Sequence, residues 1–347
     1  MPERNFRHFF IYVLKISIIP TKKLSLTSQF CTKITLLFLV MAFLKLVRYQ
    51  NLLLLVFMQL LFRYGFLNLQ NIALALTDFQ FCILVLSTVC IAAAGYVINN
   101  IFDQETDVIN NKQVVVGTTI SEAMAYNIYI ALNVLGVGSG FYLSNVIGKP
   151  GFALLFIVVS GTLYLYASSL KQSLLVGNLI VAILTAVSVI IVGLFDLFPI
   201  ITPENQIHLG ILFKIILDYA LFAFLINFIR EIIKDLEDVK GDYNLGMNTL
   251  PIALGVERTS RIVLLATGLI TVYLFYYIYI YYFENDLYIS TLYSLLTVIA
   301  PLLFFCIKLN SAKTSKDFKN LSLILKIVLL FGIISIGVNT FNILQNA

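Results

Sequence analysis

Two short stretches of this chain carry acidic side chains at a spacing that suits cation binding. The first reads NNIFDQETD, residues 99–107, and places Asn99, Asp103 and Asp107 four residues apart each time. Residues four apart lie on one face of a helix. Two carboxylates at that spacing repel each other by about a few tenths of a kcal/mol. The pattern therefore favours a cation between them.

The second stretch reads REIIKDLEDVKGD, residues 230–242, and repeats the spacing with both signs of charge. Arg230, Lys234, Asp238 and Asp242 follow one another at intervals of four residues. Gly241 predicts that the regular helix ends near Asp242. One face of this helix therefore combines two cations with two carboxylates.

This combination predicts a Mg²⁺ site that binds a phosphate-bearing ligand. Magnesium takes one or two carboxylates and keeps waters and substrate phosphates as its other ligands, while cationic side chains bind the remaining phosphate oxygens. A polar loop that is merely solvated would explain either stretch alone. The repetition of the same spacing favours the metal–diphosphate interpretation.

The elements that must position these residues are membrane-spanning helices. The chain has 347 residues, of which 60% are hydrophobic and 12% charged, whereas soluble domains carry about 25% charged residues. The net charge of +5 is scattered, which argues against nucleic-acid binding. The four cysteines lie far apart and the two histidines are isolated, so neither a disulfide framework nor a zinc site is predicted.

Nine apolar segments have the length of about 20 residues that a helix needs to cross a bilayer. In lipid, a helix satisfies its own backbone hydrogen bonds. The prediction is an all-α, polytopic membrane protein whose spans are residues 46–67, 81–98, 123–144, 151–168, 174–196, 209–229, 261–282, 288–308 and 321–343.

The distribution of lysine and arginine predicts the orientation. The loops after the even-numbered spans would carry eleven cations: Lys112, Lys171, Arg230, Lys234, Lys240, Arg258, Arg261, Lys308, Lys313, Lys316 and Lys319. The opposite side would carry three: Arg63, Lys149 and Lys214. Both aspartate stretches then face the cytoplasm, in a multi-pass protein of the cell inner membrane. Residues 1–40, whose apolar runs are too short to span, are interpreted as an N-terminal extension, and translation could instead begin at Met41.

Both aspartate stretches resemble the signatures of the UbiA superfamily of intramembrane prenyltransferases. Residues 99–107 are similar to its first motif, and DVKGD, Asp238–Asp242, is similar to its second. Weaker similarities to the first helix, to the lead into motif one and to the loop between helices 4 and 5 lie in LVRYQNLLLL (46–55), AAAGYVIN (92–99) and SLKQSLLVGN (169–178). The resemblance covers about residues 41–343, within a predicted prenyltransferase domain at 41–347.

The resemblance implies nine helices around a central cavity that is open to lipid, with both motifs at its cytoplasmic mouth. It implies that Mg²⁺ and a polyprenyl diphosphate bind there. The residues implied as metal contacts and catalytic groups are Asp103, Asp107, Asp238 and Asp242. The residues implied as diphosphate contacts are Asn99, Lys171, Arg230 and Lys234.

The sequence departs from the family pattern at two places. Asn100 stands where the family usually has its first aspartate, and NKQVVVG (111–117) lacks the basic and proline-containing segment often found downstream. Either departure would alter how the diphosphate is bound, although Asn99, Asp103 and Asp107 match the family motif.

Further predictions concern side chains inside the spans. Tyr164 and Tyr166 lie at the cytoplasmic end of the fourth span, and Tyr164 is the candidate for stabilising an allylic carbocation through a cation–π contact. Lys214 and Asp218 are four apart within the sixth span. We expect these two to form a mutual salt bridge towards a polar cavity.

The acceptor of the prenyl group is less closely defined. REIIKDLEDVKGD is most similar to the branch that makes archaeal-type ether lipids, the digeranylgeranylglyceryl phosphate synthases, which implies geranylgeranyl diphosphate as donor and geranylgeranylglyceryl phosphate as the lipophilic acceptor. The alternative is an aromatic prenyltransferase of quinone biosynthesis, which needs the same diphosphate site. A cation transporter is a third hypothesis, but it predicts charges near the bilayer midplane and broken helices, whereas these aspartates lie at helix ends.

Overall fold

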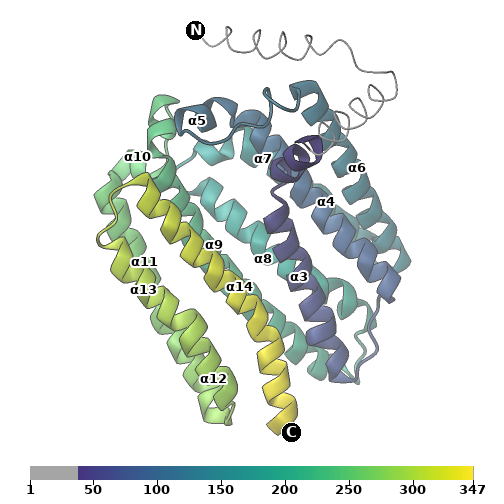
Figure 1. Cartoon of the computed structure of the whole chain (residues 1–347). Coiled ribbons are helices and arrows are strands. Elements are labelled where there is room, and N and C mark those ends of the chain that lie inside the picture. The colour runs from purple at the N-terminus through teal and green to yellow at the C-terminus, as the bar shows by residue number, and fades with distance from the viewer. Residues whose placement is uncertain (1–37, 347) are drawn as a thin grey trace, which may run out of the picture. The chain divides into compact units, whose positions relative to one another are not determined.

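The computed structural model describes residues 38–346, and the chain divides into two compact units, Met1–Lys45 and Leu46–Ala347. Of the first unit only residues 38–45 are described, and they are helical. The predicted extension at 1–40, with His8 and Cys31, therefore lies almost entirely outside the described residues. The second unit is a bundle of helices joined by short loops (Figure 1).

The membrane-length helices of the second unit alternate in direction along the chain (Figure 1). Their bounds are α3 Tyr49–Gly65, α4 Asp78–Phe102, α5 Gln104–Ile109, α6 Glu122–Val146, α7 Ala153–Ser168, α8 Val176–Asp196, α9 Gln206–Asn244, α10 Leu250–Leu254, α11 Val256–Tyr281, α12 Tyr288–Ser294, α13 Ala300–Leu309 and α14 Ser315–Asn346. A π-helical segment, Leu295–Ile299, joins α12 to α13 just before Pro301. Proline has no backbone N–H to give to the preceding turn, which accounts for an irregular helix there.

The prediction of nine spanning helices in an all-α chain is confirmed for the described residues. Nine helices are long and apolar enough to cross a membrane. Their outward faces carry large apolar side chains, such as Leu265 and Leu269 of α11, which are 70% and 74% exposed. A face of this kind is stable against lipid and not against water.

Local sequence explains where two of these helices begin. Thr77 and Gln80 form a capping box at the start of α4, in which the Thr77 hydroxyl accepts from the Gln80 amide and the Gln80 side chain accepts from the Thr77 amide. Ser121 caps α6 by accepting from the amide of Met124. Both caps satisfy N–H groups that the first helical turn leaves without partners.

The packed interior consists of two hydrophobic clusters that share α9 and α14. One cluster includes Phe62 of α3, Phe81 of α4 and Phe195 of α8, all at most 1% exposed. The other includes Phe305 of α13 and Phe318 of α14. Because α9 and α14 contribute to both clusters, they connect the two halves of the bundle.

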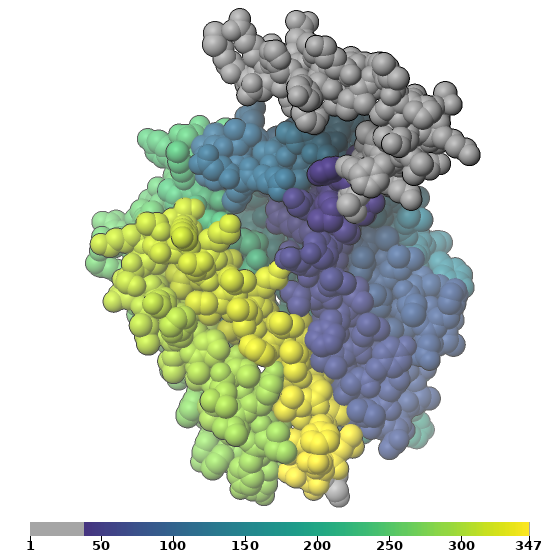
Figure 2. Space-filling model, viewed as in Figure 1, coloured from purple at the N-terminus to yellow at the C-terminus, as the bar shows by residue number. Residues whose placement is uncertain are grey.

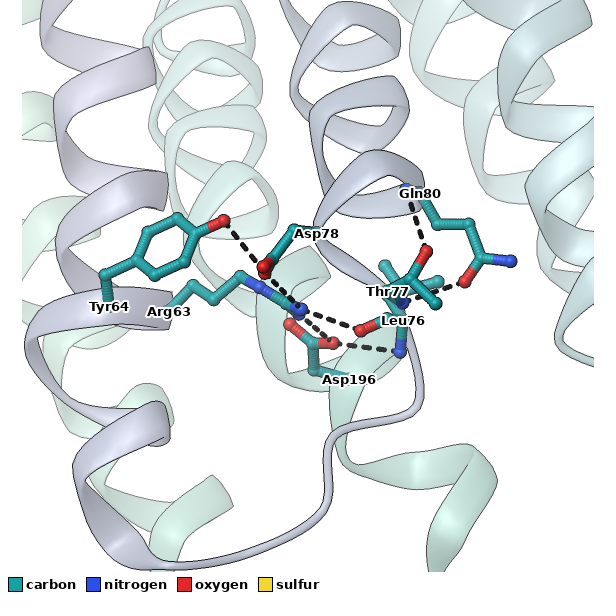
Figure 3. Close-up of polar contacts among 7 residues, drawn as sticks. All are labelled: Arg63, Tyr64, Leu76, Thr77, Asp78, Gln80 and Asp196. Carbon is teal, nitrogen blue, oxygen red and sulfur yellow. Dashed lines mark hydrogen bonds and ion pairs between the residues drawn. The ribbon is translucent and has the colours of Figure 1, made fainter.

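A buried ion pair fixes the end of the bundle away from the aspartate stretches (Figure 3). The Arg63 guanidinium of α3 donates to Asp196 Oδ1 of α8 at 2.5 Å and to the Leu76 carbonyl at 2.7 Å. The side chains of Arg63 and Asp196 are 3% and 0% exposed. Asp196 also accepts from the Leu76 amide at 3.3 Å. The pair therefore ties α3, the start of α4 and the end of α8 together.

The loops after the even-numbered spans meet at the other end of the bundle, as the orientation analysis requires. Lys112, which follows α5, bonds to Asp238 of α9. The Asn248 amide, in the loop after α9, donates to the Gln172 carbonyl in the loop after α7 at 3.0 Å. The 39 residues of α9 extend about 58 Å, against about 30 Å for the hydrocarbon core of a bilayer. The last turns of α9 therefore project beyond the membrane and can meet these loops.

Candidate active site

The first aspartate stretch lies where α4 passes into α5. Asp103 lies between α4 and α5, with φ −92° and ψ 2°. The helical backbone bonds continue across this junction, because the Asp103 amide donates to the Asn99 carbonyl at 2.9 Å and the Asp107 amide donates to the Asp103 carbonyl at 2.8 Å. The expected four-residue spacing along one face is therefore kept, although the helix is interrupted at Asp103. The Asn99 side chain donates to the Asp103 carboxylate.

The second stretch lies within α9, which continues through Gly241 to Asn244. The stripe of four residues runs from the interior of the bundle to the loops. Arg230 and Lys234 line an internal cavity, while Asp238 and Asp242 contact the loop segments beyond it. The predicted end of the helix near Asp242 agrees with the structure within two residues.

Asn110 joins the two stretches directly. Its side-chain oxygen accepts from the Gly241 amide at 2.9 Å, and its nitrogen donates to the Asp238 carboxylate at 3.4 Å. A Cβ atom on residue 241 would overlap the Asn110 amide group. Glycine at this position therefore permits the first loop to pack against α9.

Two lysines complete the contacts between the acidic residues and the neighbouring loops. The Lys112 ammonium donates to Asp238 at 2.6 Å. Lys171, in the short helical turn Leu170–Gln172, forms an ion pair with Asp103. Each aspartate stretch thus receives a cation from a different loop, and the predicted role of Lys171 as a diphosphate contact stays a prediction.

The electrostatics of the first loop reflect this crowding of charge. Burial raises the pKa of Asp107, and the neighbouring Asp103 carboxylate raises it further, against the opposing effects of Lys112 and Arg48. Burial alone would lower the pKa of Lys112, but the charge of Asp238 and the hydrogen bond to it leave that pKa raised. A negative potential that favours bound cations surrounds this loop.

The donor set suits Mg²⁺ bound together with a ligand, and not a closed protein cage. Within residues 38–346, no three or more His, Cys, Asp or Glu side chains gather closely enough to hold a metal. Asp242 lies near enough to Asp238 and Asp103 for their charges to interact, and it accepts from Thr249 Oγ1 at 3.2 Å. Magnesium usually takes one or two carboxylates and completes its shell with water and substrate phosphates. Lysine ammonium groups already occupy cation positions beside Asp103 and Asp238.

A cavity of about 330 Å³ opens beside these residues, between α3, α4, α7, α8, α9 and α14. One end is polar and is lined by Arg48, Tyr96, Asn99, Arg230, Glu231 and Lys234. The body is apolar and is lined by residues such as Leu55, Phe62, Phe156, Val189, Ile191 and Ile336. The cavity can thus accept a ligand with an anionic head and a long apolar tail.

Three charged residues of the cavity, Arg48, Glu231 and Lys326, were absent from the predicted site. Glu231 is buried and bonds to Lys234 at 2.6 Å and to Arg230 at 3.3 Å. Arg48 lies over the Tyr96 ring at 5.3 Å. Glu231 lies outside the four-residue stripe, and Arg48, at the start of the predicted first span, lies in neither aspartate stretch, so spacing alone could not identify them. The similarity of LVRYQNLLLL to the family's first helix was the one signal for Arg48.

The structure separates the two tyrosines of α7. Tyr164 is 43% exposed and packs against Phe102 and Tyr129, with ring centroids 6.2 and 6.4 Å away. It does not line the cavity, whereas Tyr166 does. Residues two apart on a helix point about 200° from each other, so only one of the two can face inwards.

Two other predicted features differ in detail. The Asn100 side chain donates to the carbonyls of Tyr96 at 2.8 Å and Leu46 at 3.3 Å, bonds that an ionised aspartate could not make. The predicted salt bridge between Lys214 and Asp218 is wrong. Asp218 accepts from the Tyr277 hydroxyl at 3.0 Å, and Lys214 lies over the Tyr281 ring.

Comparison with known proteins agrees with the resemblance of the two aspartate motifs. A family model described as the UbiA prenyltransferase family matches residues 70–330. Digeranylgeranylglyceryl phosphate synthase from Methanobrevibacter smithii is 30% identical over 268 residues, which cover 77% of this chain and 89% of that protein. The protein of the same name from Sulfolobus acidocaldarius is 35% identical over 182 residues, which cover 52% of this chain and 59% of that protein. The match thus spans less than two thirds of the Sulfolobus relative.

Solved structures share the fold. A UbiA homolog from Aeropyrum pernix K1 has a TM-score of 0.58 at 16% identity, covering 86% of this chain and 98% of that chain. A UbiA homolog from Archaeoglobus fulgidus, bound to GPP and Mg²⁺, has a TM-score of 0.52 at 16% identity. The match covers 85% of this chain and 99% of that chain. At these identities the likeness establishes the arrangement of the helices.

Proposed function

Because this chain belongs to the UbiA prenyltransferase family, as its motifs predict and its match over residues 70–330 confirms, we propose that it transfers a prenyl group from a polyprenyl diphosphate to a lipophilic acceptor with the help of Mg²⁺. The favoured donor is geranylgeranyl diphosphate. The favoured acceptor is geranylgeranylglyceryl phosphate.

The observation that carries this proposal is the polarity of the cavity beside the aspartate stretches. Its charged end adjoins Asn99, and its body is apolar over several turns of α3, α8 and α9. A prenyl diphosphate has the same division between an anionic head and a long apolar tail. Burial of such a tail in the cavity contributes to the free energy of binding about 25 cal/mol per Å² of apolar surface removed from water.

The diphosphate would bind at the polar end. Asp103, Asp107, Asp238 and Asp242 are the proposed ligands of Mg²⁺, which when bound would neutralise the phosphate oxygens. Asn99, Lys171, Arg230 and Lys234 are the proposed contacts to the diphosphate, and we add Arg48 from its place in the cavity wall. Lys171 already pairs with Asp103, so it would exchange this partner for a phosphate oxygen when a metal takes the carboxylate.

In the reaction the bond between the first prenyl carbon and the diphosphate oxygen breaks, and the electron pair leaves with the diphosphate. The cationic side chains at the cavity mouth stabilise this developing negative charge. The apolar body excludes water from the allylic cation, and Tyr166 faces it as a cation–π partner in place of Tyr164. A new carbon–oxygen bond to the acceptor hydroxyl, with loss of its proton, completes the transfer.

Two findings on relatives support the choice of substrates. The Methanobrevibacter smithii and Sulfolobus acidocaldarius relatives are named digeranylgeranylglyceryl phosphate synthase. The Archaeoglobus fulgidus homolog binds GPP, and also DMAPP, with Mg²⁺. A donor with a diphosphate head and an acceptor from ether-lipid synthesis fit both findings.

The chain is an integral multi-pass membrane protein. We propose that the aspartate stretches face the cytoplasm and that the protein resides in the cell inner membrane. The excess of lysine and arginine in the loops after the even-numbered spans supports this orientation.

The proposal is tested by incubating the purified chain in lipid nanodiscs with radiolabelled geranylgeranyl diphosphate and Mg²⁺. Parallel samples contain geranylgeranylglyceryl phosphate, hydroxybenzoate, naphthoate or homogentisate. Label on the glycerol phosphate that disappears with EDTA is the expected result. Label on an aromatic compound would support prenyl transfer but show that the acceptor is aromatic and is not geranylgeranylglyceryl phosphate. Absence of both transfer and diphosphate binding would refute the proposal.

A further inference from the structure

A single lysine interrupts the last span. Lys326 is the only charged residue between Leu321 and the end of the chain. It lies on α14, is half-buried, and its ammonium donates to Asn51 Oδ1 of α3 at 2.8 Å. An ionisable residue inside a spanning helix is costly and usually marks a functional site.

Lys326 faces the cavity and not the lipid. It lines the cavity together with Asn51 and Arg230. The helices α3 and α14, though far apart in the chain, pack against each other at this point and lie on the face shown in Figure 2. Lys326 therefore stands where the cavity reaches the seam between the first and the last span.

The charges along the cavity wall are unbalanced. Among its charged lining residues in the described part of the chain, one acid, Glu231, faces four cations: Arg48, Arg230, Lys234 and Lys326. Glu231 bonds to Arg230 and Lys234. The contact recorded for Lys326 is to a neutral amide, and Arg230 Nε is buried without a hydrogen-bond partner. Cations gathered in this way favour an anionic ligand.

Three of these cations, Arg48, Arg230 and Lys234, are the proposed contacts to the donor diphosphate, which leaves Lys326 for a second anion. Asp103 and Asp238 pair with Lys171 and Lys112, which come from the loops. Lys326 comes from α14, which contributes none of the proposed donor contacts. A two-substrate reaction needs a second place where the acceptor is held while the first prenyl carbon is attacked.

We propose that Lys326 and Asn51 form a second anion subsite, which binds the anionic head group of the acceptor at the α3–α14 seam. This inference rests on the proposed prenyl transfer and extends it to the acceptor. The ligand chemistry is an oxyanion attached to an apolar body, from either a lipid phosphate or an aromatic carboxylate. Lys326 supplies the charge, and Asn51 orients the Lys326 ammonium.

The test measures binding of each substrate separately, in nanodiscs and without turnover. The ligands are geranylgeranyl diphosphate with Mg²⁺, geranylgeranylglyceryl phosphate, its uncharged analogue geranylgeranylglycerol, and 4-hydroxybenzoate. The variant Lys326→Gln removes the charge but keeps a donor for Asn51, and Lys326→Arg keeps the charge. Lys316→Gln, at an exposed position of the same helix, is the matched control.

We expect Lys326→Gln to weaken binding of the phosphate lipid at least about tenfold, as for loss of a charged hydrogen bond. Binding of the diphosphate and of the uncharged analogue should stay within about twofold, and Lys326→Arg and Lys316→Gln should resemble the parent. The same pattern with 4-hydroxybenzoate alone would support the subsite with an aromatic carboxylate as its ligand. An unchanged affinity for both anions, or an equal loss for the diphosphate, would overturn the inference while leaving the transfer itself in place. A parent protein that does not bind the diphosphate would overturn the proposed function as well.

Discussion

The buried pair of Arg63 and Asp196 provides a quantitative test of how the bundle is held together. Replacing Asp196 by alanine removes the 2.5 Å bond from Arg63 and the bond from the Leu76 amide. Arg63 then keeps the Leu76 carbonyl and the Asp78 carboxylate at 3.3 Å. The Asp78 side chain is 75% exposed, so water screens its charge.

The expected cost follows from this difference in burial. Removal of one partner from a buried ion pair leaves an uncompensated charge and costs about 3–5 kcal/mol. Replacing the exposed Asp78 by alanine should cost about 1 kcal/mol or less. The double change Arg63→Met with Asp196→Leu removes both charges, and we expect it to recover most of the loss.

The free energy of unfolding can be measured in mixed micelles by titration with SDS. Far-ultraviolet circular dichroism is the suitable signal, because the chain contains no tryptophan. Prenyl transfer by the folded fraction should be retained, since the pair lies at the far end of the bundle from the aspartate stretches. Equal costs for Asp196→Ala and Asp78→Ala would refute the reasoning, because burial would then make no difference.

Four other predictions concern the site. Asp103→Ala or Asp238→Ala should abolish transfer while the yield of folded protein stays near that of the parent, and near-normal turnover in either variant would contradict the site assignment. EDTA should abolish transfer and added Mg²⁺ should restore it, which a radiolabel assay measures directly; persistent transfer in EDTA would argue against a metal. Gly241→Ala should lower turnover, because the added Cβ would displace the loop that packs on α9. The control is Gly210→Ala, at an exposed position of the same helix. Gly246→Ala would not serve as the control, because residue 246 has φ +67° and alanine would strain the backbone there. Tyr166→Leu should lower kcat about 2- to 30-fold, from a cation–π contact of about 0.5–2 kcal/mol, while Tyr164→Leu should not; equal effects would remove Tyr166 from the reaction.

The local arrangement of the two aspartate stretches was predictable from the sequence, because it depends only on helical spacing. Asn99, Asp103 and Asp107 keep their helical spacing through the junction of α4 and α5, because the backbone bonds are local. The stripe from Arg230 to Asp242 likewise lies on one helix. The choice between Tyr164 and Tyr166 was not predictable, because it depends on how α7 is rotated against α4 and α8.

The mutual salt bridge expected for Lys214 and Asp218 shows the same limit. Their spacing allows a pair on one helical face. Tyr277 of α11 contacts Asp218 instead. A partner on another helix can replace a local one, and spacing carries no information about that partner.

The sequence by itself determined the membrane class and the nine spans, because hydrophobic length is a property of each segment alone, and its two aspartate motifs indicated the family by their resemblance. Only the tertiary structure decided that Asn110 and Gly241 join the two aspartate stretches and that Arg48 and Glu231 line the cavity. It also decided that Lys326 meets Asn51 across 275 positions of the chain. The physical reason is that these contacts depend on the packing and rotation of whole helices, which no single segment encodes.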